Sequence, residues 1–295
     1  MIENPSQPTS HTYTSQRLRL HYLDWGNEDA PPLLLVHGGR DHARSWDWMA
    51  RELSEDYHII AVDQRGHGDS QWNAAGNYVS DEFICDMAKL VDTAGLAPVR
   101  ILSHSMGSIV SLRYAGIFPQ NVVKVMAIEG FGGRPSRRRA SEDAPLHDRY
   151  RQWIERMRDF AERPLRRYPD MEEAIARMAE ANAHLSAEQA RHLTIHGVNR
   201  NEDGSFSWKF DPCFYGRFLV PSGLNPPDGP DLWRQIICPV LLVRGADSWA
   251  LGPEESGAAD NFKNVRCEII QDAGHWVHHD QLDQVLELAR GFLVG

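Results

Sequence analysis

The chain has 295 residues, of which 42% are hydrophobic and 24% charged. This composition is typical of a globular protein and excludes a disordered chain, a collagen and a small disulfide scaffold. The formal net charge of −10 argues against a nucleic-acid-binding surface, because nucleic-acid binders usually carry a basic face.

The cysteines and the first residues of the chain indicate the cellular compartment in which we expect the protein. The four cysteines form no C-x-x-C pair and have no histidine at ligand spacing, so we expect reduced thiols: Cys85, Cys213, Cys238 and Cys267. Residues 1–14 lack a basic segment followed by an apolar one, and no apolar run approaches the roughly 20 residues of a membrane span. We expect a cytoplasmic protein with no membrane or nucleic-acid partner; the sequence does not indicate its oligomeric state.

Short apolar runs recur along the chain at the spacing of strands. Residues 17–25 alternate apolar and polar side chains, and we expect an antiparallel strand pair there. Later runs are predominantly apolar, which is typical of strands in a parallel sheet: 33–36, 57–62, 99–102, 122–128, 240–243 and 265–270. Helical stretches at 81–94, 106–117 and 281–293 alternate with these runs. The pattern predicts an α/β fold with a mostly parallel, doubly wound sheet.

One long segment interrupts this alternation. It contains helical stretches at 147–163, 170–183 and 186–196, a turn signal at 201–204 and an aromatic run at 206–210. We predict a core domain of residues 1–131 and 231–295 with a helical cap inserted at 132–230. Residues 134–167 hold 11 arginines against 6 acidic residues. We interpret them as solvated helix faces with intrahelical ion pairs.

A candidate nucleophile lies where the run at 99–102 passes into a helical stretch. The sequence there is Ser103-His104-Ser105-Met106-Gly107. A nucleophile elbow needs small residues two positions before and after the nucleophile, because the turn is too sharp for larger ones. Ser103 and Gly107 meet this need around Ser105.

Glycines after the run at 33–36 are candidate parts of the same site. His37-Gly38-Gly39 would let backbone N–H groups point into a cavity, and the N–H groups of Gly39 and Met106 would stabilise a developing oxyanion. The charged turn at 63–70, which follows the run at 57–62, is interpreted as structural.

The last apolar run is followed by a histidine on a glycine loop. His275 would reach across the carboxyl edge of the sheet, where ligands bind in open α/β folds, and is the candidate base. The adjacent His278 and His279 are interpreted as first-turn residues of the last helix. The two histidines could suggest a metal, but no carboxylate or cysteine cluster supports one.

Together these motifs resemble the α/β-hydrolase superfamily. They are H-G-G after one strand, D-x-R-G-x-G-x-S after the next, S-x-S-x-G at the elbow and a late G-H-W. Their order covers nearly the whole chain, and the insertion falls where that superfamily carries its lid. The resemblance implies an α/β-hydrolase fold with a helical cap and a Ser–His–acid mechanism that needs no cofactor or metal. The chain departs from the usual motif at Ser103, where the first glycine is expected.

The resemblance leaves two positions open for the acid. The commoner one follows the run at 240–243, where Asp247 is close but out of register. The other is Glu129, which lies 24 residues after Ser105, the interval found in haloalkane dehalogenases. Those enzymes and epoxide hydrolases use an aspartate nucleophile, so Ser105 disfavours both activities. For either carboxylate the alternative is a helix N-cap or an ion-pair partner.

The implied reaction is acyl transfer from a small ester or lactone to Ser105. We expect substrate contacts from Arg40, Phe131 and Trp276, whereas aromatic residues of the cap would line the pocket or pack the cap onto the sheet: Trp153, Trp208, Phe210 and Phe214. Two alternatives use the same fold. One is hydrolysis of a carbon–carbon bond in a ring-cleavage product; the other is a receptor for a small ligand with little turnover.

Overall fold

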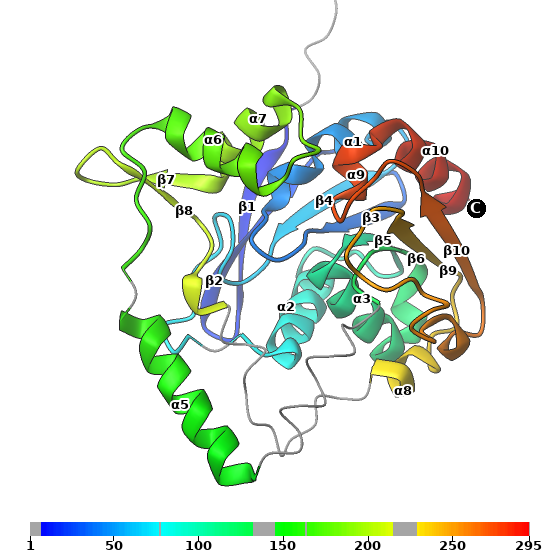
Figure 1. Cartoon of the computed structure of the whole chain (residues 1–295). Coiled ribbons are helices and arrows are strands. Elements are labelled where there is room, and N and C mark those ends of the chain that lie inside the picture. The colour runs from blue at the N-terminus through cyan, green and yellow to red at the C-terminus, as the bar shows by residue number, and fades with distance from the viewer. Residues whose placement is uncertain (1–6, 77, 132–144, 163, 215–228, 295) are drawn as a thin grey trace, which may run out of the picture.

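The computed structural model describes residues 7–76, 78–131, 145–162, 164–214 and 229–294. Its centre is an eight-stranded sheet in the order β1-β2-β4-β3-β5-β6-β9-β10 (Figure 1). The strands are β1 (Thr9–Ser15), β2 (Leu18–Asp24), β3 (Pro32–Val36), β4 (His58–Asp63), β5 (Val99–His104), β6 (Val122–Ile128), β9 (Val240–Gly245) and β10 (Val265–Ile270). β2 is antiparallel to β1 and β4, and the pairs from β4 to β10 are parallel. The predicted fold class is confirmed.

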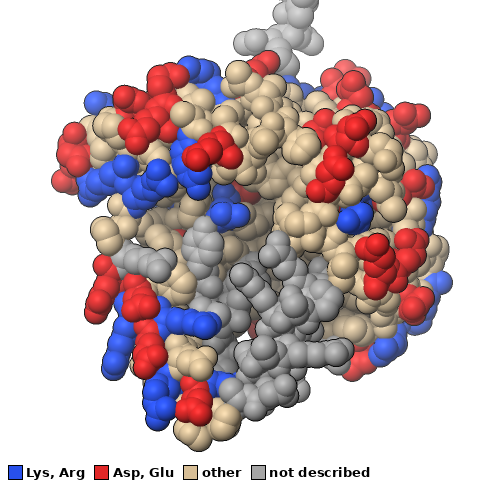
Figure 2. Space-filling view, viewed as in Figure 1, with Lys and Arg blue, Asp and Glu red and all other residues tan. Residues whose placement is uncertain are grey.

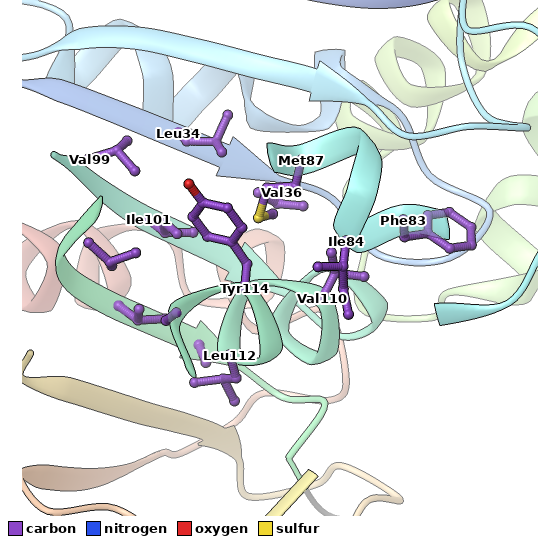
Figure 3. Packing of buried hydrophobic residues seen from close by; sticks show 14 of the residues in the cluster. Leu34, Val36, Phe83, Ile84, Met87, Val99, Ile101, Val110, Leu112 and Tyr114 are labelled. Carbon is purple, nitrogen blue, oxygen red and sulfur yellow. The ribbon is translucent and has the colours of Figure 1, made fainter. Parts of the chain in front are cut away.

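Helices cover both faces of the sheet. Strand β3 shows why, because Leu34 and Val36 belong to one buried cluster and Leu33 and Leu35 to the other, as the period of two in a strand requires. The first cluster packs under α2 (Ser80–Thr93) and α3 (Met106–Ile117) (Figure 3). The second packs under α1 (Asp47–Leu53) and α10 (Leu282–Leu293). Among the described helices, none combines the length and apolar character that a bilayer crossing requires.

The start of the chain differs from the expected strand pair at 17–25. Those residues form the single strand β2, and its partner is β1. Strand β1 reads TSHTYTS, and five of its seven residues are exposed at the edge of the sheet. Only Tyr13 and Ser15 are buried, and one aromatic side chain among threonines and serines does not give the apolar alternation by which a strand is found in a sequence.

The described part of the segment 132–230 holds α5 (Leu146–Glu162), α6 (Met171–Ala181), α7 (Ala187–Gly197) and a hairpin of β7 (Val198–Arg200) and β8 (Phe206–Trp208). Asp170 caps α6, and Ser186 and Gln189 form a capping box on α7. A small cluster of Tyr168, Ala174 and Val198 is buried between these elements. The predicted start of the cap at residue 132 lies outside the described residues. The predicted end of the cap at residue 230 falls within α8 (Gly229–Trp233).

Acidic and basic side chains are interleaved along α5 and across the outer surface of α6 and α7 (Figure 2). Arg151 pairs with Asp148 at 2.8 Å on α5, and Arg177 pairs with Glu180 at 2.7 Å on α6. Both pairs are local and exposed, so each contributes little to stability. Of the two, the Arg151–Asp148 pair lies within residues 134–167 and is of the exposed intrahelical kind expected for the arginines there.

Candidate active site

The turn between β5 and α3 places Ser105 at the carboxyl edge of the sheet. Ser105 has φ 52° and ψ −112°, and its N–H donates to the carbonyl of Ile128 at 2.8 Å. A Cβ on Gly107 would lie 2.4 Å from the carbonyl oxygen of Val36, so no side chain fits there. Ser103 is fully buried on β5, where its small side chain fits. The strained backbone exposes the Ser105 hydroxyl above the strand ends.

The close approach at Gly107 supports a stability prediction. We expect Gly107→Ala to destabilise the fold by more than about 3 kcal/mol, because the added methyl meets the backbone of β3 and cannot rotate away. Gly291 of α10 is the control, since a Cβ there meets nothing within 4 Å, and Gly291→Ala should stabilise by about 0.5–1 kcal/mol. Urea unfolding measures both changes. Equal stability of the two variants would contradict the packing argument.

His275 lies in the loop between β10 and α9 (Val277–Asp280). Its Nε2 is 2.9 Å from the Ser105 hydroxyl oxygen, and its Nδ1 is 3.3 Å from Glu129 Oε2. A proton on Nδ1 faces the carboxylate and leaves Nε2 to accept from the hydroxyl. The structure therefore brings these three predicted residues into one line.

Glu129 directly follows β6 and has a left-handed conformation, with φ 59° and a fully buried side chain. Its Oε1 accepts a hydrogen bond from the Gly245 N–H at 3.0 Å, and its own N–H donates to Val243 at 2.8 Å. The following residue, Gly130, has φ 80°, and a Cβ there would lie 2.0 Å from the Ser105 carbonyl oxygen. The β9 backbone and the elbow together fix the carboxylate beside His275.

Asp247 has a different position. Its side chain is exposed, and its N–H donates to the Ala273 carbonyl at 2.9 Å. The structure records neither a hydrogen bond nor an ion pair between the described side chains of Asp247 and His275. Strand β9 ends at Gly245, and the turn that follows directs the aspartate to solvent. Of the two expected acids, the structure brings only Glu129 to His275.

The predicted oxyanion residues border the nucleophile. Met106 is the first residue of α3, directly after Ser105. The glycine pair after β3 packs against the elbow, since a Cβ on Gly38 would lie 3.3 Å from the Ser105 Cβ and 2.7 Å from His104 Nδ1. Gly39 follows, and a Cβ there would lie 2.9 Å from the Phe214 ring. A side chain at position 39 would therefore have to displace the Phe214 ring.

The expected substrate-contacting residues have unequal positions. Phe131 is 5% exposed and belongs to the core cluster under α2 and α3. Trp276 is half-buried at the start of α9, with its ring 5.3 Å from that of His279. Arg40 is exposed after the glycines, with φ 67°. All three remain predictions as substrate contacts.

Trp249 is a site neighbour that sequence reasoning did not assign. Its ring centroid is 4.7 Å from that of His275, and the residue is 57% exposed. The loop after β9 therefore supplies an aromatic side chain to the histidine rather than a carboxylate. Of the cap aromatics, Phe214 contacts Gly39 and His67, whereas Trp208 donates to the Tyr168 hydroxyl at 2.9 Å within the cap.

Several further histidines are buried behind the elbow. His104 and His278 have ring centroids 4.7 Å apart, and His278 is 4.1 Å from His279. Burial is the main cause that lowers the pKa of His104 and His278 well below the usual value, and it lowers the pKa of His279 to about 4. These imidazoles are therefore neutral at pH 7. Asp41 lies beside His104 and His278, with one possible ligand atom of each within 4.8 Å of the others.

A half-buried histidine on α7, His196, makes the stability of the fold depend on pH. Burial, chiefly, lowers the pKa of His196 to about 4. The nearby Arg44, His192 and His42 also lower this pKa, whereas Asp47 opposes the shift. Between pH 6.5 and pH 4 the unfolded chain binds a proton that the folded chain rejects, so stability falls as the pH is lowered through this window. We expect His196→Gln to weaken this dependence in urea unfolding, whereas His147→Gln, at an exposed position on α5, keeps it. If the free energy of unfolding depended on pH identically in the wild type and in His196→Gln, the assignment of this dependence to His196 would be wrong.

Comparison with known proteins places this geometry in a family. Residues 31–282 match the family model of the alpha/beta hydrolase fold, so the chain belongs to this family and is a hydrolase. Esterase Rv0045c of Mycobacterium tuberculosis is 25% identical over 279 residues, which cover 92% of this chain and 85% of that protein. Esterase YbfF of Escherichia coli is 25% identical over 268 residues, which cover 89% of this chain and 92% of that protein. A crystal structure of E-2-(acetamidomethylene)succinate hydrolase has a TM-score of 0.78 at 22% identity, covering 97% of this chain and 99% of that one.

Proposed function

We propose that this protein hydrolyses a small carboxylic ester or lactone through an acyl-enzyme on Ser105. The observation that carries the proposal is the 2.9 Å contact between the Ser105 hydroxyl and His275 Nε2, with Glu129 behind the ring. Two relatives of similar length named as esterases support this choice of substrate. The aspartate nucleophile expected of an epoxide hydrolase has no counterpart, because serine occupies the elbow.

In the proposed reaction Ser105 attacks the acyl carbon while His275 takes its proton. Glu129 holds the imidazole in the tautomer that can accept this proton and stabilises the imidazolium. The backbone N–H groups of Gly39 and Met106 stabilise the oxyanion of the tetrahedral intermediate, where losing one donor costs on the order of 100–1000-fold in rate. His275 then protonates the leaving alcohol. Water, activated by the same ring, releases the acid from Ser105.

The test combines turnover with covalent labelling. The full chain is incubated with p-nitrophenyl acetate and, separately, with an organophosphonate, and the labelled peptide is identified by mass spectrometry. Ester turnover together with an adduct on Ser105 supports the proposal. Ser103→Ala is a matched control, because it removes a neighbouring hydroxyl and should still label. An adduct on another residue would overturn the nucleophile assignment. The absence of both turnover and an adduct would favour the receptor alternative.

A further inference from the structure

Three side chains that are distant in the sequence converge behind the elbow. Asp41, His104 and His278 are 4%, 1% and 1% exposed. Each offers a ligand atom, and these atoms all lie within 4.8 Å of one another. Among the described residues, Asp41 Oδ2, His104 Nδ1 and both ring nitrogens of His278 have no hydrogen-bond partner. Buried polar atoms usually find partners, so this group requires an explanation.

The protonation of His104 follows from its other nitrogen. Its Nε2 lies 2.8 Å from the carbonyl oxygen of His275, and a carbonyl only accepts, so the proton is on Nε2. In the neutral ring Nδ1 then carries a bare lone pair. It faces the cluster, where it needs a donor or a Lewis acid.

Asp41 adds a second acceptor. Its Oδ1 accepts the N–H of His42 at 2.9 Å, which leaves Oδ2 facing the two histidines. A buried carboxylate oxygen without a partner is costly. The ring of His278, stacked at 4.5 Å on Trp46, can supply one more nitrogen lone pair. Three lone pairs from two neutral rings and one carboxylate oxygen form an environment that favours a cation.

Two other groups of possible ligands in the described residues lack this character. In the group of Asp47, His192 and His196, Arg44 already pairs with the aspartate at 2.8 Å. In the group around Asp63, the carboxylate accepts from His21, from the Ala43 N–H and from the Asp69 N–H. A cation would have to displace these partners. Of these three groups among the described residues, the cluster behind the elbow is the one whose ligand atoms are buried and have neither a hydrogen-bond nor an ion-pair partner.

We propose that Asp41, His104 and His278 bind a divalent transition-metal ion of the zinc type. Two imidazoles and one carboxylate form a ligand set that Zn²⁺ takes in proteins, with bonds of about 2.0–2.2 Å. Tetrahedral bonds of that length place ligand atoms roughly 3.3 Å apart, so side-chain rotations must draw these atoms together by at most about 1.5 Å. Through its Nε2–H, His104 connects this site to the carbonyl of His275. An ion there would lie behind the catalytic line without touching the substrate.

The direct test is crystallographic. Crystals of the full chain are soaked in ZnCl₂, and anomalous data are collected above and below the zinc absorption edge. The proposal expects an anomalous peak between Asp41, His104 and His278. Density with no anomalous signal, which a bridging water would give, overturns the proposal. A zinc peak solely at another site, such as His192 or an exposed cysteine, overturns it equally. This test uses the wild-type protein and does not depend on any variant folding.

A solution experiment adds a second readout. Chelator-treated protein is equilibrated with Zn²⁺, allowing time for entry because the ligands are buried. At 100 times Kd we expect Tm to rise by about 5 °C. Asp41→Asn keeps the shape of the side chain and removes its charge, so it should lose most of this shift, and His278→Gln should do the same. His192→Gln is the matched control and should keep the shift. A shift retained in both ligand variants contradicts the site, whatever the outcome of the ester assays.

Discussion

Ser105→Ala is expected to abolish ester turnover while leaving the fold intact. If Ser105 is the nucleophile, kcat/KM should fall by about 10⁴–10⁶-fold, because no other group lies between His275 and the acyl carbon in the proposed reaction. Alanine keeps the Cβ and needs no new space at the elbow. The loss of the 2.9 Å bond to His275 should change Tm by only about 2–3 °C. Initial rates with p-nitrophenyl acetate and thermal unfolding provide the two measurements.

Ser108 supplies a control for hydroxyl removal near the elbow. Its side chain is buried and donates to the Ile128 carbonyl at 3.0 Å, so Ser108→Ala perturbs the same turn without touching the proposed nucleophile. This variant should retain most of its activity. A Ser105→Ala variant with the wild-type rate would remove the basis of the acyl-enzyme mechanism.

Glu129→Gln is expected to lower kcat by about 10³–10⁴-fold with little change in KM. The Gly245 N–H donates to Oε1 at 3.0 Å and needs an acceptor, so the amide oxygen of glutamine must occupy that position. The amide NH₂ then faces His275 Nδ1 and forces the ring to carry its proton on Nε2. In that tautomer Nε2 cannot accept the Ser105 proton, although the packing is unchanged. Pre-steady-state and steady-state ester hydrolysis separate kcat from KM.

Asp247→Asn is the paired variant, because it removes the other carboxylate considered for the acid. The side chain is exposed, so we expect activity to change by less than about 3-fold. If Asp247→Asn were the more damaging of the two, the acid would have to reach His275 by a rearrangement of the loop after β9. The ranking of the two variants, rather than either value alone, decides between the carboxylates.

The order of the central strands and helices could be predicted from the sequence, and the same reading placed the proposed nucleophile, Ser105, at the turn between a strand and a helix. The apolar runs of the central strands mark a sheet buried on both faces, and this pattern is local. The elbow could also be recognised from the sequence, because the requirement for small residues at positions 103 and 107 arises within a few consecutive residues. Strand β1 could not be predicted from the sequence, because most of its side chains are exposed at the sheet edge and are not apolar.

The proposal of Glu129 rather than Asp247 as the acid rests on the tertiary structure. Both follow strands that neighbour each other in the sheet, β6 and β9, and spacing along the chain favours neither decisively. What separates them is the Gly245 N–H, which reaches across from β9 to hold the Glu129 carboxylate, while the next turn directs Asp247 outward. A hydrogen bond between residues 116 positions apart leaves no periodic signal.

The sequence by itself determined the fold class and presented the serine, the histidine and the glycines as a set, because each rests on the steric needs of a few consecutive residues. The tertiary structure alone decided which side chains meet. From the sequence, His278 is indistinguishable from an ordinary helix residue, and only the folded chain places Asp41 and His104 beside this residue of α9. Steric requirements within a turn depend on a few consecutive residues and can be recognised in the sequence. A set of ligand residues depends on contacts between distant segments, which only folding brings together.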